Sequence, residues 1–148
     1  MSKAAHLLDT SAILTFTDNE EGAEAVEELL ERAKKGETLV HISAMTAMEL
    51  YYVSWGERGE EEADRLLLFV RALPVTELSL ESALVVPAAR FKARYKISVA
   101  DAWIAATAAI HDLILVHKDP EFERISEEVS LLSLPFKLKK KKKTLGKG

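Results

Sequence analysis

The sequence predicts an α/β fold in which helices cover both faces of a mostly parallel β-sheet. Short apolar runs of strand length alternate with longer segments of helical periodicity along almost the whole chain. Strands joined through helices need crossover connections, and the resulting sheets are parallel and buried on both faces. The 148 residues, 48% of them hydrophobic, are enough for one domain with its own core.

Each expected element has a local signal in the sequence. The strands are short apolar runs at residues 6–9, 38–43, 75–78, 113–117 and 129–134. The helices follow the 3.6-residue apolar period at residues 11–16, 20–35, 43–55, 59–72, 80–95 and 98–111, and a short helical turn is expected at 121–126.

Several boundaries of these helices carry typical capping residues. Gly36 is placed to end the helix over 20–35, and Ser43 is placed to begin the next one. Ser98 begins the last long helix, three residues before Asp101. Pro87 is expected to kink or divide the helix over 80–95, because proline lacks the backbone N–H that a helix interior uses.

The charge is divided unevenly between the body of the chain and its end. The net charge is −4, but seven of the 20 Lys and Arg residues lie in 137–148, which has no acid. The preceding part therefore carries 13 basic residues against all 24 acidic ones, which argues against a general basic surface for nucleic acid. We predict a domain over 1–136 and a basic, disordered tail over 137–148, which either solubilises the chain or gathers nucleic acid by counterion release.

The chain has no cysteine, which excludes disulfides, thiolate metal sites and a cysteine nucleophile and fits a reducing compartment. The N-terminal part of the sequence has no basic stretch followed by an apolar run, so we expect no signal peptide. No apolar run approaches the roughly 20 residues that span a bilayer. We therefore expect a cytoplasmic protein with no membrane partner.

Two acidic residues follow expected strands. Asp9 ends the run HLLD, and Asp119 follows LILVHK. Each has an ordinary structural interpretation, because Asp caps helices and forms turns before proline. The carboxyl ends of parallel strands are, however, also where the ligand site of an open α/β sheet lies.

Two further acidic residues lie in apolar helical segments. Glu49, in SAMTAMELYYVSW, has few basic neighbours, and burying an unpaired carboxylate costs several kcal/mol. Its alternative interpretation is a salt bridge at the rim of that face. Asp101, in SVADAWIAATAAIHD, fits a capping box and the helix dipole, but an acid that faces other acids there also suits a cation.

Taken together, the four acids favour a metal site over four separate structural roles. Two of them lie at strand ends and two on adjoining helices. A carboxylate cluster without lysine or arginine repels itself unless a divalent cation intervenes. Oxygen ligands in a chain without cysteine suit Mg²⁺ or Mn²⁺.

Four segments that contain these acids resemble the motifs of a known family. They are LLDTSAIL, ISAMTAMELYYV, SVADAWIAATA and LILVHKDPEFERI, and their order and spacing are similar to those of PIN-domain ribonucleases, most closely the VapC-type toxins of toxin–antitoxin pairs. The resemblance covers about residues 6–134. It implies a three-layer α/β/α sandwich with a five-stranded parallel sheet.

The resemblance also implies a metal-dependent endoribonuclease. The family's acidic quartet, catalytic and bound to Mg²⁺ or Mn²⁺, is matched by Asp9, Glu49, Asp101 and Asp119. Thr10 and Ser11 match a polar pair, in which Ser11 would contact the substrate and steady a ligand water or a carboxylate. Metal-bound carboxylates can activate a water and orient it in line with an RNA phosphodiester. A homodimer and a small protein antitoxin are implied as partners, with residues 21–33 as one wall of the antitoxin groove.

The resemblance leaves the roles of two residues near Asp119 open. His117 stands where many relatives have Thr or Ser, and it either bonds a phosphate or is a strand-end histidine without a role, which we favour. Glu121 stands where relatives often have Asp, and with Asp112 it is a weaker ligand candidate.

Basic and aromatic residues suggest further contacts with substrate. Arg90 and Arg94, in a basic run before the Asp101 helix, form either a solvated surface or a phosphate-binding rim. Tyr51, Tyr52 and Trp55 could stack bases, but aromatic residues on one helix amid Met and Leu more often belong to a core or dimer interface.

Two other functional classes compete with the nuclease. A catalytically silent PIN-like module would bind RNA or protein without cutting, but it would have no physical reason to keep an unpaired acidic cluster. A different Mg²⁺-dependent phosphotransfer enzyme of one such family would need a second Asp two places after the first, which DTSAIL lacks.

Overall fold

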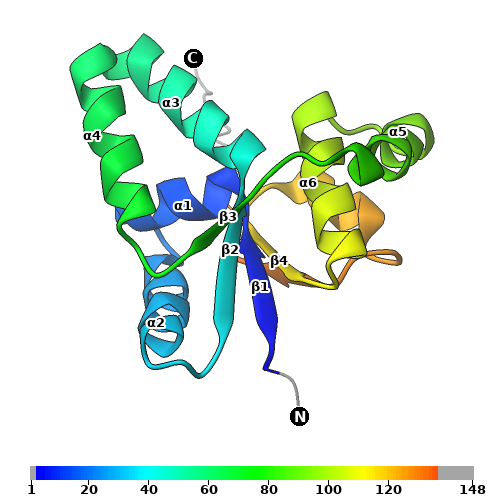
Figure 1. Cartoon of the computed structure of the whole chain (residues 1–148), viewed down its shortest axis with the longest axis horizontal. Helices are drawn as coiled ribbons and strands as arrows, with labels where there is room; N and C mark the ends of the chain where they lie inside the picture. Colours follow the sequence, from blue (N-terminus) through cyan, green and yellow to red (C-terminus); the bar gives the residue numbers. More distant parts are fainter. Residues whose placement is uncertain (1–2, 137–148) are drawn as a thin grey trace, which may run out of the picture.

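The computed structural model of the chain describes residues 3–136 and has the predicted α/β architecture (Figure 1). Five strands form one parallel sheet in the order β3-β2-β1-β4-β5. They are β1 (Ala5–Leu8), β2 (Leu39–Ser43), β3 (Thr76–Leu78), β4 (Ile114–His117) and β5 (Leu131–Ser133). The predicted basic tail, residues 137–148, lies outside the described residues, so the division into domain and tail stays a prediction.

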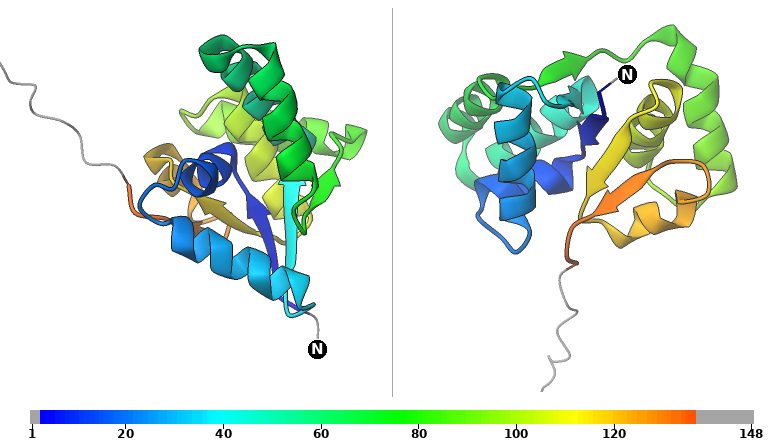
Figure 2. Two further views of the ribbon diagram at one scale, coloured as in Figure 1. Left: turned by 90° about the vertical axis from the view of Figure 1, so that its left-hand side faces the viewer. Right: turned by 90° about the horizontal axis from the view of Figure 1, so that it is seen from below.

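Helices cover both faces of the sheet, which confirms the three-layer sandwich (Figures 1 and 2). They are α1 (Thr10–Thr17), α2 (Ala23–Lys34), α3 (Ala44–Arg58), α4 (Glu60–Arg71), α5 (Val85–Arg94) and α6 (Val99–Ile110), with 3₁₀ segments η1 (Ser82–Leu84) and η2 (Pro120–Ile125). Helices α1 to α4 share one apolar core with the sheet, and α5, α6 and η2 share the other. Within residues 3–136, no helix is both long enough and apolar enough to cross a membrane.

The helix predicted over 80–95 is shorter than expected. A 3₁₀ segment occupies Ser82–Leu84, and the α-helix begins only at Val85. Pro87 then lies in the first turn of α5, where its missing N–H removes no bond of the helix interior. The change from 3₁₀ helix to α-helix therefore comes two residues before Pro87, and Pro87 lies within the start of α5.

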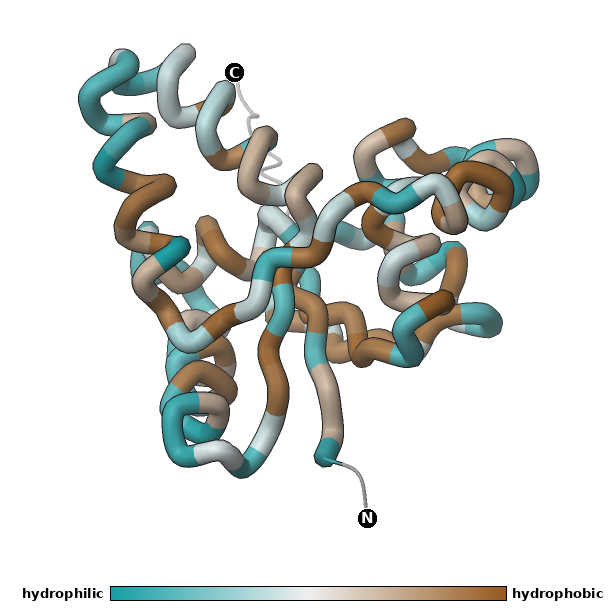
Figure 3. The backbone as a smooth tube through the Cα atoms, viewed as in Figure 1, coloured by the Kyte–Doolittle hydropathy of each residue, from teal (hydrophilic) through white to brown (hydrophobic). Residues whose placement is uncertain are grey.

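The two central strands anchor both cores. Leu7 and Leu115 pair across β1 and β4 and belong to the core under α5 and α6. Leu8 and Val116, one residue further on, pair likewise and belong to the core under α1 and α2. All four side chains are fully buried, and in Figure 3 hydrophobic segments gather around the strands while the turn between α3 and α4 is hydrophilic. The ends of β1 and β4 are therefore fixed points of the fold.

The strand order reverses beside β1. Strands β2 and β3 lie on one side of it, and β4 and β5 lie on the other. In an open parallel sheet, the crevice at the carboxyl ends of the strands around such a reversal is where ligands bind. Asp9 directly follows β1, and Asp119 lies two residues after the end of β4, so both stand at this crevice.

Polar residues cap the helices that leave this edge of the sheet. Asp9 caps α1, Ser43 caps α3 and Ser98 caps α6, each accepting a backbone N–H at 3.0 Å. After α2, Gly36 has a φ of 79°, and its N–H and that of Glu37 bond back to the last turn, as a Schellman cap requires. The capping predicted at Gly36, Ser43 and Ser98 is thereby confirmed.

Gly22 lies where the segment between α1 and α2 meets the end of β5. Its φ is 103°, and a Cβ atom there would lie 3.0 Å from Pro135 Cδ and 3.3 Å from Leu134 Cβ. Both the backbone conformation and the available space therefore require glycine at this position.

We expect Gly22→Ala to lower the free energy of unfolding by about 1–2 kcal/mol, because an L side chain is strained at that φ. The matched control is Gly56→Ala within α3, where a Cβ would meet nothing within 4 Å and where Ala is favoured over Gly by about 0.5–1 kcal/mol. Urea unfolding followed by circular dichroism measures both changes. Effects of the same sign in the two variants would contradict this account of Gly22.

Candidate metal centre

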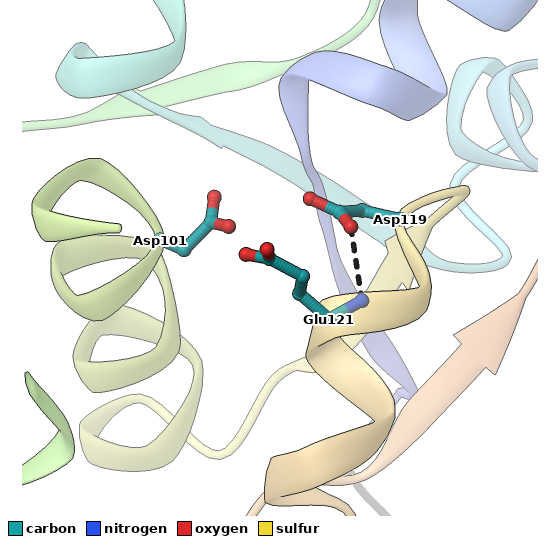
Figure 4. Close-up of side chains that lie close together, drawn as sticks. All are labelled: Asp101, Asp119 and Glu121. Atoms are coloured by element: carbon teal, nitrogen blue, oxygen red, sulfur yellow. Dashed lines mark hydrogen bonds between the residues drawn. The ribbon is translucent and has the colours of Figure 1, made fainter. Parts of the chain in front are cut away.

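Three carboxylates from two elements meet at the carboxyl edge of the sheet (Figure 4). Asp101 comes from the first turn of α6, whereas Asp119 and Glu121 come from the start of η2, just after β4. One oxygen of each side chain lies within 4.8 Å of the other two. The N–H of Glu121 donates to Asp119 Oδ1 at 2.9 Å, which orients that carboxylate (Figure 4). Such a group of oxygen donors could hold one divalent cation.

Asp9 lies deeper than these three residues, with 4% of its surface exposed. Its Oδ2 accepts hydrogen bonds from the backbone N–H of Ser11 at 3.0 Å and from the Ser11 hydroxyl at 2.5 Å. Burial raises the pKa of Asp9 to about 6; the Ser11 bonds oppose this rise, and the charge of Glu49 adds to it. Asp9 is therefore the cap of α1 and an acid of the site at once.

Glu49 approaches the site from α3 and is half-buried. Its Oε1 accepts a hydrogen bond from the Thr10 hydroxyl at 2.7 Å, and that hydroxyl also lies 3.4 Å from Thr46 Oγ1. The alternative interpretation of Glu49, a salt bridge at a helix rim, is wrong. Within residues 3–136, no lysine, arginine or histidine forms an ion pair with any acid of the site.

The pKa of Asp101 depends on its burial and on the charges of the other acids in the site. Burial is the main cause that raises the pKa of its carboxyl to about 8, and the negative charges of Asp9, Asp119, Glu49 and Glu121 raise it further. All four predicted acids and Glu121 therefore interact at this edge of the sheet. Complete ionisation of the group is unfavourable unless a cation compensates the charge.

Ser11 joins the two strand ends that carry the site. Its hydroxyl donates to Asp9 and accepts the backbone N–H of Lys118 at 2.9 Å. The Lys118 ammonium donates to the Glu21 carbonyl at 2.7 Å and lies 3.5 Å from Glu20. These contacts fit the predicted role of Ser11 in steadying a carboxylate, whereas its contact with substrate stays a prediction.

The structure separates the sequence candidates into two sets. Asp101 and Asp119 belong to the 4.8 Å group, whereas Asp9 and Glu49 lie outside it and act through their charges. Glu121, a weaker candidate in the sequence, is a full member of the group. Its signal was the spacing of two residues from Asp119 across a proline, which places both side chains at the start of η2.

The other candidates lie at the surface. Arg90 and Arg94 are exposed on α5, and Arg94 lies 3.6 Å from Glu128. Tyr52 and Trp55 are 56% and 48% exposed, so these two aromatic residues do not belong to the core. Asp112 is exposed beyond the far end of α6, about 16 Å along the helix axis from Asp101.

Comparison with known proteins identifies the family. The model of the PIN domain family matches residues 6–128. The chain belongs to the PIN domain family. A search of curated proteins found no match.

Solved structures share the fold of this PIN domain. VapBC2 from Rickettsia felis, bound to a promoter DNA fragment, has a TM-score of 0.73 and 18% identity over 88% of this chain and 99% of that chain. VapBC-1 from nontypeable Haemophilus influenzae has a TM-score of 0.68 and 23% identity over 87% of this chain and 97% of that chain. Mycobacterium tuberculosis VapC20, described as a sarcin–ricin loop cleaving toxin, has a TM-score of 0.63 and 13% identity over 85% of this chain and 96% of that chain.

The raised pKa of Asp101 predicts how pH changes the stability of the metal-free PIN domain. Between about pH 4 and 8, the folded protein keeps a proton on Asp101 that the unfolded chain has lost. The free energy of unfolding therefore falls as the pH rises through this range. Asp101→Asn has no such proton, so we expect its stability relative to wild type to increase between pH 5 and pH 8, on the order of 2 kcal/mol after screening by solvent.

Urea unfolding in EDTA at pH 5, 6.5 and 8 measures this difference. Burial lowers the pKa of His6 and His117, which acts in the opposite direction below pH 6.5, but both histidines are present in each protein and cancel in the comparison. Asp112→Asn is the matched control and is expected to follow wild type at all three pH values. A stability difference between Asp101→Asn and wild type that is the same at every pH would contradict the assignment.

Proposed function

We propose that this PIN domain is a Mg²⁺- or Mn²⁺-dependent endoribonuclease and the toxin of a VapC-type toxin–antitoxin pair, acting on RNA in the cytoplasm. The observation that carries the proposal is the meeting of Asp101, Asp119 and Glu121 at the sheet edge, without a basic partner among residues 3–136. Membership of the PIN family and the shared fold with a toxin described as cleaving the sarcin–ricin loop support it.

The donor set fits a hard divalent cation, because every candidate ligand is a carboxylate oxygen. Asp101, Asp119 and Glu121 would hold the ion, and Asp9 and Glu49 would add ligands or charge. A bound ion of this kind supplies an activated water and compensates the charge that develops on a phosphodiester. The protein orients the acids: Ser11 holds Asp9, Thr10 holds Glu49, and the N–H of Glu121 holds Asp119.

RNA must be bound by basic groups outside the acidic centre. We propose that Arg90 and Arg94 on α5, which packs beside α6, contact the phosphates of the substrate. Both side chains are exposed, and Arg94 would exchange its ion pair with Glu128 for a phosphate. Such contacts position a nucleic acid without reading its bases.

A groove of about 730 Å³ beside the centre is our candidate site for the antitoxin. Apolar side chains from α1, α3 and α4 line it, including Leu14, Leu50, Leu66 and Phe69, while Ser11 and Lys118 also belong to its wall. Charged side chains line the groove as well, and a groove with both apolar and charged walls suits an amphipathic helix. Several of the matching structures are VapBC complexes. None of its lining residues belongs to the predicted wall at 21–33.

We also retain the predicted homodimer as part of the proposal. The exposed apolar side chains of α3 are its candidate surface, namely Met48, Tyr52 and Trp55. Large exposed apolar side chains gathered on one helix typically mark a protein contact.

Cleavage of labelled RNA tests the nuclease proposal. Wild-type protein with Mn²⁺ is expected to cut RNA, and EDTA is expected to abolish cutting. Asp101→Asn is expected to lower the rate at least about 100-fold, because it removes a charged ligand. Asp112→Asn makes the same chemical change beyond the other end of α6, at a φ of 54° that Asn tolerates, and should cut like wild type.

Equal cleavage in wild type, Asp101→Asn and EDTA would refute the metal mechanism. A protein that binds Mn²⁺ but cuts no RNA would favour the silent module. The toxin part of the proposal has its own readout, since expression of wild type, but not of Asp101→Asn, is expected to arrest the growth of a bacterial host.

A further inference from the structure

His117, at the end of β4, is fully buried, and both ring nitrogens have partners. Nδ1 accepts the backbone N–H of Asp119 at 3.0 Å. Because Nδ1 is an acceptor, the proton of the neutral ring is on Nε2. Nε2 lies 3.0 Å from Glu123 Oε2 and 3.2 Å from Ser133 Oγ, and the Ser133 hydroxyl also donates to Glu123.

The surroundings of the ring allow a single orientation. Phe122 lies edge-on with ring centroids 5.2 Å apart, and the Phe136 ring lies 5.9 Å away. The carbonyl of His117 accepts the N–H of Leu134 at 2.7 Å, so its backbone is held as well. A buried ring with both nitrogens engaged cannot contact a phosphate, so the sequence interpretation of His117 as a phosphate contact is wrong.

We propose that His117 is a positioning residue for the metal centre. Its bond to the N–H two residues further on has the spacing of an Asx turn, in which a side-chain acceptor fixes the backbone at residue i+2. That residue is Asp119, whose carboxylate is also held by the N–H of Glu121 at 2.9 Å. The chain of contacts from Ser133 and Glu123 through His117 therefore sets the position at which Asp119 faces Asp101.

The proposal replaces our expectation that His117 has no role, and it rests on the proposed function. Some residues do not touch the metal but hydrogen-bond to its ligands and orient them. Their loss typically lowers metal affinity 10- to 100-fold. If His117 had no positioning role, its replacement would leave metal affinity unchanged, although it could still alter stability. Metal affinity and stability therefore have to be measured separately.

The test is the Mn²⁺ affinity of RNA-free protein, measured by isothermal titration calorimetry. His117→Leu introduces an apolar side chain of similar volume that has no acceptor, so we expect Mn²⁺ to bind 10- to 100-fold more weakly. His117→Asn keeps an acceptor that can close the Asx turn, so we expect affinity close to that of wild type. Thermal unfolding in EDTA, recorded for both variants, reports the structural role alone.

A second variant keeps the test decisive if His117→Leu does not fold. Glu123, whose side chain is 45% exposed, can be changed to Ala with little loss of packing, and Glu123→Ala leaves Nε2 of the ring with Ser133 Oγ as its only hydrogen-bond partner among the described residues. We expect Mn²⁺ to bind about tenfold more weakly to it. Glu127→Ala is the matched control, because it removes an exposed acid of equal charge from the turn that follows η2 and should bind like wild type.

The outcomes separate this inference from the proposed function. Weak binding by His117→Leu together with rescue by His117→Asn would support the positioning role. Unchanged affinity in His117→Leu, or in Glu123→Ala where the first variant is unfolded, would overturn it and leave the nuclease proposal intact. Wild-type protein that binds no Mn²⁺ would overturn the metal centre, and the positioning role with it.

Discussion

The crowding of carboxylates at one edge of the sheet determines the electrostatics of the candidate site. Burial and the charges of four neighbouring acids raise the pKa of Asp101 to about 8. The fold imposes this crowding, because Leu7, Leu8, Leu115 and Val116 anchor β1 and β4 in cores on both faces. The strands that lead to Asp9 and Asp119 therefore cannot relax apart to relieve the repulsion.

The hydrogen bonds around the acids orient them without neutralising them. Asp9, Glu49 and Asp119 each accept a bond from a neutral hydroxyl or backbone N–H. A lysine or arginine in those places would satisfy the same oxygens and also cancel the charge. Lys118, the nearest basic residue in the sequence to Asp119, is instead bound to the segment that follows α1. No basic side chain among residues 3–136 therefore compensates the negative charge of the site.

Local signals in the sequence were sufficient for the fold and for the region of the site, but not for its geometry. Apolar runs and caps such as Ser43 and Ser98 act over a few residues, so the strands and most helices could be predicted. Strand ends placed Asp9 and Asp119 at one edge. That Glu121, not Glu49, joins the closest group depends on side-chain directions around η2. The network of His117 depends on Ser133, 16 residues later on a neighbouring strand, and no local pattern contains that contact.

The number of protons released on metal binding shows directly whether a cation can replace a proton on these acids. If the acids hold a proton only because no cation is present, Mn²⁺ added to metal-free wild type at pH 7 in weak buffer should displace about one proton per protein, mainly from Asp101. Asp101→Asn should release about one proton fewer. Mn²⁺ that binds wild type without releasing a proton, or that does not bind at all, would contradict the account.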